Sequence, residues 1–269
     1  MVSKSQNRSG LYYRHVSKAE ASILLSSRSG ADEIVLPKSL RSFFVRYAQQ
    51  HLRALPWRTS RVKPFHLLLA EVLLIQTKAG DVARIWPQLV KKYRSPRMLV
   101  AARRETLIGL LKPLGLQNQR AQSLKRISGT LLERFNDKVP STVQELLSIP
   151  HVGLYAATAV SCFGFGQRVP IVDANVLRVL GRIRGTQMGK DLRRTPDVWA
   201  AAWSILPKAD TSLHNYGLLD FASAICRIRK PLCESCPLRT DCIYGQKRTT
   251  TGDSCADSSS GHQTSPLDE

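Results

Sequence analysis

LLSIPHVGLYAATAV, at residues 146–160, and PIVDANVLRVL, at residues 170–180, together predict three helices. In the first stretch a tight turn containing Pro150 and Gly153 separates two apolar runs, which predicts two helices joined by that turn. In the second stretch Asp173 precedes an apolar run and belongs to a residue type that commonly caps a helix N-terminus. Backbone N–H groups of such a turn, with the N-terminus of the helix after it, form a ready site for a phosphate group.

Helical spacing continues along most of the chain, for example at Val82, Ile85, Trp86 and Leu89. Prolines separate these segments at intervals of about one helix length. No apolar–polar alternation typical of strands and no solenoid repeat is found. The sequence therefore predicts an all-α protein of about ten helices.

The two ends of the chain are less clearly patterned. Residues 1–35 are mixed in composition, and we expect a loosely ordered arm. Residues 246–269 are rich in Ser, Thr and Asp and contain almost no large apolar residue. Such a segment cannot bury enough surface to offset its ordering entropy, so we expect a disordered tail in which Cys255 is an incidental free thiol.

The charge of the chain is strongly positive, with 40 Lys and Arg against 20 Asp and Glu. Residues 36–245 hold 33 of the basic and 13 of the acidic residues, so the excess belongs to the body of the protein. Such a charge favours a nucleic acid over an anionic membrane as partner. No apolar run approaches the about 18 residues of a spanning helix, and no secretory signal begins the chain. We expect a cytoplasmic protein without a membrane partner, associated with the nucleoid in a bacterium.

Glu71 stands inside the apolar segment FHLLLAEVLLI, residues 65–75. Burial of a carboxylate is costly and raises its pKa. One interpretation is a structural pair between Glu71 and a nearby arginine. The other is a carboxyl group that faces a ligand pocket and donates or accepts a hydrogen bond there.

Four of the six cysteines are clustered in CRIRKPLCESCPLRTDC, residues 226–242, with the spacing C-x6-C-x2-C-x5-C. Four thiolates this close can hold one zinc ion or a [4Fe–4S] cluster. Zinc sites more often contain two C-x2-C pairs, so the spacing favours the cluster. The predicted ligands are Cys226, Cys233, Cys236 and Cys242.

These motifs together resemble the endonuclease III and MutY branch of helix-hairpin-helix DNA glycosylases. The cysteine spacing is similar to the cluster motif of that branch, and the two opening stretches resemble its hairpin, usually L-P-G-V-G, and its V-D-x-N-V motif. LPWR at 55–58 and EVLLIQT at 71–77 are similar to stretches of MutY. One departure is His151, which replaces the first hairpin glycine.

The resemblance implies two helical domains with the DNA cleft and the active site between them. Residues 66–180 would form the domain with the hairpin, and residues 36–65 with 181–245 would form the domain with the iron–sulfur loop. It implies a duplex DNA partner that contains a mismatch, and we expect the protein to be monomeric.

The resemblance also implies roles for individual residues. Asp173 would stabilise the oxocarbenium-like transition state that forms when the N-glycosidic bond of a flipped base breaks. Glu71 and Tyr155 would complete the catalytic set. The expected DNA contacts are Ile75, Gln76, Leu116, Gln117, Asn118, His151, Val152 and Gly153.

Tyr155 indicates the subclass. Endonuclease III enzymes carry at this position a lysine that forms a Schiff base, and MutY carries a serine. Tyrosine resembles thymine mismatch glycosylases, which implies a monofunctional enzyme that removes thymine or uracil opposite guanine. An adenine-specific mismatch glycosylase, a non-catalytic helix-hairpin-helix DNA-binding protein and a zinc-bound interaction protein are the alternatives.

Overall fold

The computed structural model describes residues 18–26, 36–59, 61–186 and 195–250. Within these ranges the chain forms helices and connecting turns without a strand, which confirms the predicted all-α class. The helices are α1 (Lys18–Ser26), α2 (Leu40–His51), α3 (Pro64–Leu73), α4 (Ala79–Lys92), α5 (Pro96–Val100), α6 (Arg104–Leu111), the 3₁₀ helix η2 (Lys112–Leu114), α7 (Gln117–Phe135), α8 (Val143–Leu147), α9 (Leu154–Phe165), α10 (Ala174–Arg184), α11 (Pro196–Ser204), α12 (Thr211–Ala224) and α13 (Ile243–Thr250).

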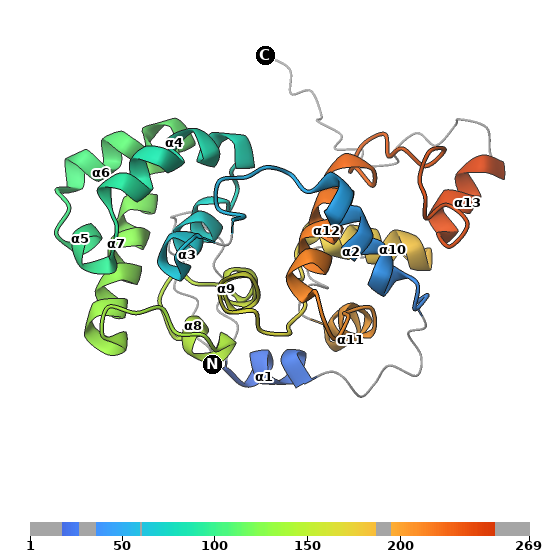
Figure 1. Ribbon diagram of the computed structural model, residues 1–269, viewed down its shortest axis with the longest axis horizontal. Helices are drawn as coiled ribbons and strands as arrows, with labels where there is room; N and C mark the ends of the chain where they lie inside the picture. Colours follow the sequence, from blue (N-terminus) through green and yellow to red (C-terminus); the bar gives the residue numbers. More distant parts are fainter. Residues whose placement is uncertain (1–17, 27–35, 60, 187–194, 251–269) are drawn as a thin grey trace, which may run out of the picture.

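One hydrophobic core joins helices α3 to α9, which lie together on one side of the molecule (Figure 1). α9 packs against α3 and α8, and its residues 156–162 are all buried. Small side chains permit this close packing, and a Cβ atom added at Gly164 would lie 3.3 Å from Leu67 Cδ2. This core fixes α3 and α9 relative to each other.

A second core joins α2, α10, α11 and α12 on the other side (Figure 1). Its centre is the contact between α2 and α12, where Phe44 and Phe221 meet edge to face at 5.7 Å. A Cβ atom at Gly217 would lie 1.9 Å from the carbonyl oxygen of Phe44, so only glycine allows the two backbones to approach this closely.

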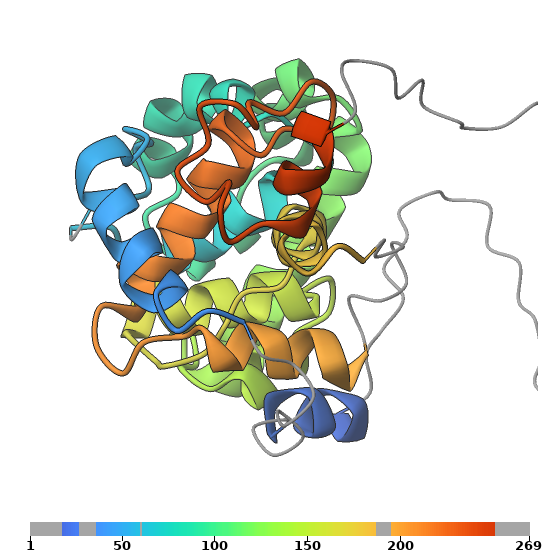
Figure 2. The same ribbon diagram turned by 90° about the vertical axis from the view of Figure 1, so that its right-hand side faces the viewer.

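The two ends of the chain contain more structure than the sequence indicated. Part of the predicted loose arm forms α1, which packs against α8 and α11 because Ala21 and Leu24 are buried. Part of the predicted disordered tail belongs to α13, and Figure 2 shows α13 with the cysteine-containing segment on the outer face of the second core. Residues 1–17, 27–35 and 251–269, with Cys255, lie outside the described residues.

Two connecting segments run between the two cores, and the candidate site lies beside them. Residues 52–63 lead from α2 to α3, and residues 166–173 lead from α9 to α10 (Figure 1). Ile171 belongs to the first core and Val172 to the second, and the buried apolar residues of α10 belong to the second core. The sequence-based boundary at residue 180 stays a prediction. None of the helices in the described ranges combines the length and apolar character that a membrane crossing needs.

Candidate active site

Three titratable side chains from three helices meet where the two cores adjoin. Glu71 lies near the C-terminal end of α3, Tyr155 is the second residue of α9, and Asp173 is the N-cap of α10. Both carboxyl groups act on the Tyr155 hydroxyl and raise its pKa, after the larger effect of burial. The structure therefore brings the three predicted catalytic residues together, although they are far apart in the sequence.

Glu71 is buried, with 2% of its surface exposed. Its Oε2 atom makes no hydrogen bond with any described residue. Burial raises the pKa of Glu71 to about 7, although Arg58 and a hydrogen bond with Tyr155 lower it. No basic side chain in the described ranges forms an ion pair with Glu71. The carboxyl group can therefore donate or accept a hydrogen bond near neutral pH.

Tyr155 is half-buried and forms a hydrogen bond with the Glu71 carboxyl group. Burial and the nearby carboxyl groups raise the pKa of Tyr155 well above its ordinary value. The phenol therefore keeps its proton at neutral pH. It can donate a hydrogen bond or pack against a flat ligand, but it supplies no amine for a covalent bond to a sugar.

Both carboxylate oxygens of Asp173 accept hydrogen bonds at the start of α10, and Oδ1 caps the helix. Oδ1 accepts hydrogen bonds from the N–H groups of Asn175 and Val176, each at 2.8 Å. Oδ2 accepts a hydrogen bond of 2.6 Å from Asn175 Nδ2. These bonds fix the direction of a half-buried carboxylate, so the capping role and a role in chemistry are compatible.

Sequence reasoning missed an ion network beside this site. Asp220, 1% exposed, accepts hydrogen bonds from Arg58 Nη1 at 2.7 Å and from Arg53 Nε at 2.6 Å. The backbone N–H group of Arg53 also donates to Asp220, at 3.0 Å. The network fixes the connection between α2 and α3, because both arginines lie in it and Asp220 lies on α12.

Tyr216 completes this network on the side of Glu71. Its ring stacks on Phe163 at 3.7 Å, and the Arg58 guanidinium covers its other face at 4.3 Å. Burial raises the pKa of Tyr216, and Glu71 contributes to that rise. Two signals were present in the sequence: Arg58 ends the LPWR motif, and Tyr216 and Asp220 lie one helical turn apart on the same face.

The hairpin turn precedes α9. His151 has a positive φ of 65° in place of the glycine that this position favours, and its Nδ1 atom shares a hydrogen bond of 3.3 Å with Ser123 Oγ. Val152 is 2% exposed, so its side chain belongs to the core and only its backbone can reach a ligand. Gly153 is the N-cap of α9, whose first N–H groups have no acceptor within the helix.

The other expected DNA contacts lie in two neighbouring turns. Gln76 is exposed with a φ of 56°, and Leu116 is 44% exposed with a φ of 49°. Left-handed backbone costs about 1 kcal/mol for such residues, so the surrounding structure must hold both turns. Ile75 is half-buried, and Gln117 begins α7. Asn118 is exposed and accepts a hydrogen bond of 3.4 Å from Arg104.

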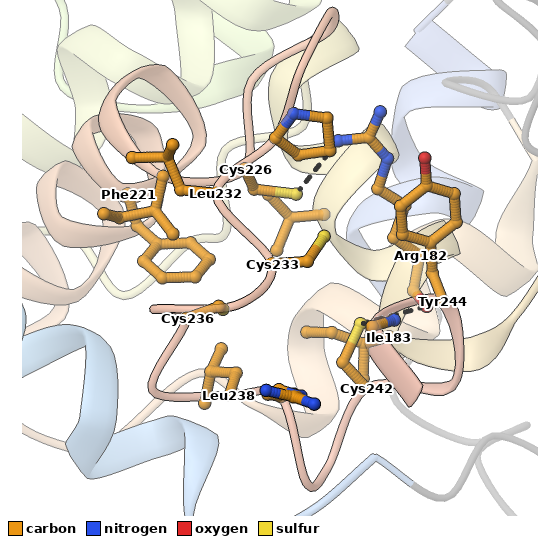
Figure 3. A pocket seen from close by; sticks show the side chains of 15 residues that line it. Arg182, Ile183, Phe221, Cys226, Leu232, Cys233, Cys236, Leu238, Cys242 and Tyr244 are labelled. Atoms are coloured by element: carbon orange, nitrogen blue, oxygen red, sulfur yellow. Dashed lines mark hydrogen bonds between the residues drawn. The ribbon is translucent and has the colours of Figure 1, made fainter. Parts of the chain in front are cut away.

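The four clustered cysteines line one pocket with Arg182 and Tyr244 (Figure 3). No three His, Cys, Asp or Glu side chains in the described ranges are arranged to hold a single metal ion. Arg182 Nη1 donates to Cys226 Sγ at 3.4 Å, and the Gly245 N–H group donates to Cys242 Sγ at 3.4 Å. Burial raises the pKa of Cys236 to about 11, so a bound metal must displace a proton there.

The fold is that of a helix-hairpin-helix DNA glycosylase. A helical hairpin, an aspartate that caps the following helix and a buried carboxyl group adjoin one another at the junction of two helical cores. The chain belongs to the HhH-GPD superfamily of base excision DNA repair proteins, which residues 69–200 match.

Curated relatives and a solved structure support this membership. The chain is 36% identical over 193 residues to the thymine-DNA glycosylase of Aeropyrum pernix, a match covering 71% of this chain and 86% of the relative. It is 33% identical over 198 residues to the thymine/uracil-DNA glycosylase of Methanothermobacter thermautotrophicus, covering 74% and 89%. A thermostable thymine-DNA glycosylase structure superposes with a TM-score of 0.74 at 31% identity, covering 78% of this chain and 96% of that one.

Proposed function

We propose that this chain is a monofunctional DNA glycosylase that removes thymine or uracil opposite guanine from duplex DNA during base excision repair. The similar proteins named as thymine and thymine/uracil glycosylases support this substrate class. The observation that carries the proposal is the buried Glu71 carboxyl group next to Tyr155, because its Oε2 atom has no hydrogen-bond partner within the described part of the chain. A buried oxygen atom without a hydrogen-bond partner suits a ligand that brings the missing polar group.

A pyrimidine turned out of the duplex supplies such a group. The unpaired Glu71 oxygen accepts a hydrogen bond from N3–H of the base when ionised, and the protonated carboxyl group donates one to O4. The Tyr155 ring packs against the flipped base. Tyr216 is not available for stacking, because Phe163 and Arg58 already cover its two faces.

Asp173 acts on the sugar. Cleavage of the bond between C1′ and the base develops positive charge on the sugar ring, and a nearby carboxylate stabilises this charge. The capping hydrogen bonds keep the Asp173 carboxylate from reorienting as the charge forms. A water molecule then adds to C1′, and the products are the free base and an abasic site. The half-buried phenol of Tyr155 cannot form a Schiff base, so the DNA strand stays intact.

The half-buried hairpin turn at the N-terminus of α9 and the net charge of +20 suit binding of DNA phosphates by a monomer. We also propose that the cysteine pocket holds a [4Fe–4S] cluster. The four thiols line one pocket, and four thiolates are the usual ligand set of such a cluster. Cys226, Cys233, Cys236 and Cys242 would hold the cluster, which would anchor the basic loop after α12. A yellow-brown preparation with broad visible absorbance is expected, and a colourless protein that contains zinc would refute this assignment.

A panel of duplexes tests the function. Radiolabelled duplexes with T:G, U:G, A:G and A:8-oxoguanine pairs are incubated with excess protein and then treated with alkali to reveal abasic sites. Excision of thymine and uracil is expected, without strand cleavage before the alkali step. Asp173→Asn should lower the excision rate about a thousandfold with little change in duplex affinity. Excision confined to adenine would refute the proposed substrate, and cleavage without alkali would refute the monofunctional mechanism.

A further inference from the structure

Arg120 is a buried cation in α7 that the proposed chemistry does not use. It is 6% exposed, and its guanidinium reaches across to two separate turns. Among its hydrogen bonds, Nε donates to Gly115 O at 3.0 Å, Nη1 donates to Leu73 O at 3.1 Å, and Nη2 donates to Ile75 O at 3.2 Å and to Thr77 Oγ1 at 2.6 Å.

Leu73 is the last residue of α3, and the other three acceptors belong to two turns that hold exposed residues in left-handed backbone. Turn 74–77 follows α3 and presents Gln76, and turn 115–116 precedes α7 and presents Leu116. Glu71 is only one helical turn before the first of them. The planar fork of the arginine therefore sets the spacing of two surface features next to the base pocket.

We propose that Arg120 is a positioning residue, which holds Gln76 and Leu116 in place to enter the duplex when the target base leaves the stack. This inference rests on the proposed function, because it assigns the two turns a part in base flipping. An exposed leucine and an exposed glutamine on rigid turns suit that part: the apolar side chain fills the vacated space, and the amide can pair with the base left behind.

Lys125 provides a matched control on the same helix. It also donates from α7 to backbone carbonyl groups, those of Val100 and Ala102. Its acceptors lie at the C-terminal end of α5 and in the connection from α5 to α6, and not in the two turns. A general loss of α7 packing would therefore follow either substitution, whereas a loss of turn geometry would follow only the change at Arg120.

The experiment compares Arg120→Met, Arg120→Lys, Thr77→Val and Lys125→Met in the full chain. Single-turnover excision is measured on a T:G duplex and on a duplex with thymine opposite an abasic-site analogue, where no paired base needs replacement. In parallel, 2-aminopurine beside the T:G pair reports unstacking by its fluorescence on binding, without any need for excision. Circular dichroism verifies folding, and Thr77→Val keeps the test decisive if Arg120→Met fails to fold.

Arg120→Met should lower T:G excision by about 10-fold to 100-fold and suppress the fluorescence rise, with little change on the abasic-site duplex. Arg120→Lys and Thr77→Val should change the same quantities less, and Lys125→Met should match the unsubstituted protein. Equal losses on both duplexes, an undiminished fluorescence rise, or an equal effect of Lys125→Met would overturn the inference. Failure of the proposed function gives a different result. The unsubstituted protein would then excise no mismatched pyrimidine, whereas the fluorescence comparison would still test the positioning role of Arg120.

Discussion

Replacement of Glu71 by glutamine should stabilise the protein, and the gain should depend on pH. The folded-state pKa of Glu71 is about 7, against an ordinary value of 4.5. Below the ordinary pKa both the folded and the unfolded chain hold the proton, so the ionisation of Glu71 does not lower the free energy of unfolding. As the pH rises from 4.5 through 7, the unfolded chain ionises first and becomes favoured, and folding stability falls. Glutamine does not titrate and escapes this penalty.

The size of the effect follows from the same pKa values. At about 1.4 kcal/mol per pH unit, the interval between them corresponds to a penalty of about 3 kcal/mol above neutral pH. For a protein of this size that penalty equals about 6–12 °C in melting temperature. The melting-temperature advantage of Glu71→Gln should therefore be small at about pH 5 and grow by this amount by about pH 8.

Calorimetry or circular dichroism at several pH values measures this advantage. Glu133→Gln is the control, because Glu133 lies exposed on α7 and the same substitution there removes no buried carboxyl group. The same Glu71→Gln protein should lose most of its excision activity, since a neutral amide oxygen accepts the N3–H hydrogen bond more weakly than a carboxylate does. A pH-independent melting-temperature difference for Glu71→Gln would refute the reasoning about burial.

Other substitutions probe the surroundings of the site. Asp220→Asn should lower the unfolding free energy by about 3–5 kcal/mol in denaturant titrations, because buried positive charge loses its partner. Arg53→Ala should cost about 1 kcal/mol or less, since that side chain is 42% exposed. His151→Gly should leave stability nearly unchanged, because relief of left-handed strain offsets the lost hydrogen bond, whereas Ser123→Ala should cost about 1 kcal/mol in the same titrations. Tyr155→Lys should create an enzyme that borohydride traps on mismatched DNA, and absence of a covalent complex would count against the placement of this residue.

The sequence was informative where one segment determines its own surroundings. A helix that is apolar nearly all round must be buried on every side, so the burial of Glu71 could be predicted from FHLLLAEVLLI alone. The capping position of Asp173 was equally local, because a cap depends on the residues that directly follow it. The all-α class followed from the same periodicity along the chain.

Features that depend on distant partners were not predictable in this way. Arg58 and Asp220 are separated by 162 positions, and nothing in either segment identifies the other. Helix α1 was missed because its nine residues form a short segment with weak helical periodicity, which packs against α8 and α11. Arg120 did leave a signal, since it precedes Leu124 and Ile127 on the apolar stripe of α7, where a basic residue needs buried acceptors.

The carboxylate that serves two arginines restricts the order in which this part of the protein can evolve. Loss of Arg53 leaves Asp220 paired with Arg58, so a sequence can tolerate that change first. Loss of Asp220 first would leave two arginines on the connection that leads to α3 without this carboxylate, and one of the two side chains is only 5% exposed. Descendants that lack Asp220 should therefore carry earlier or simultaneous replacements of its partners, and ancestral reconstruction can look for that sequence of events.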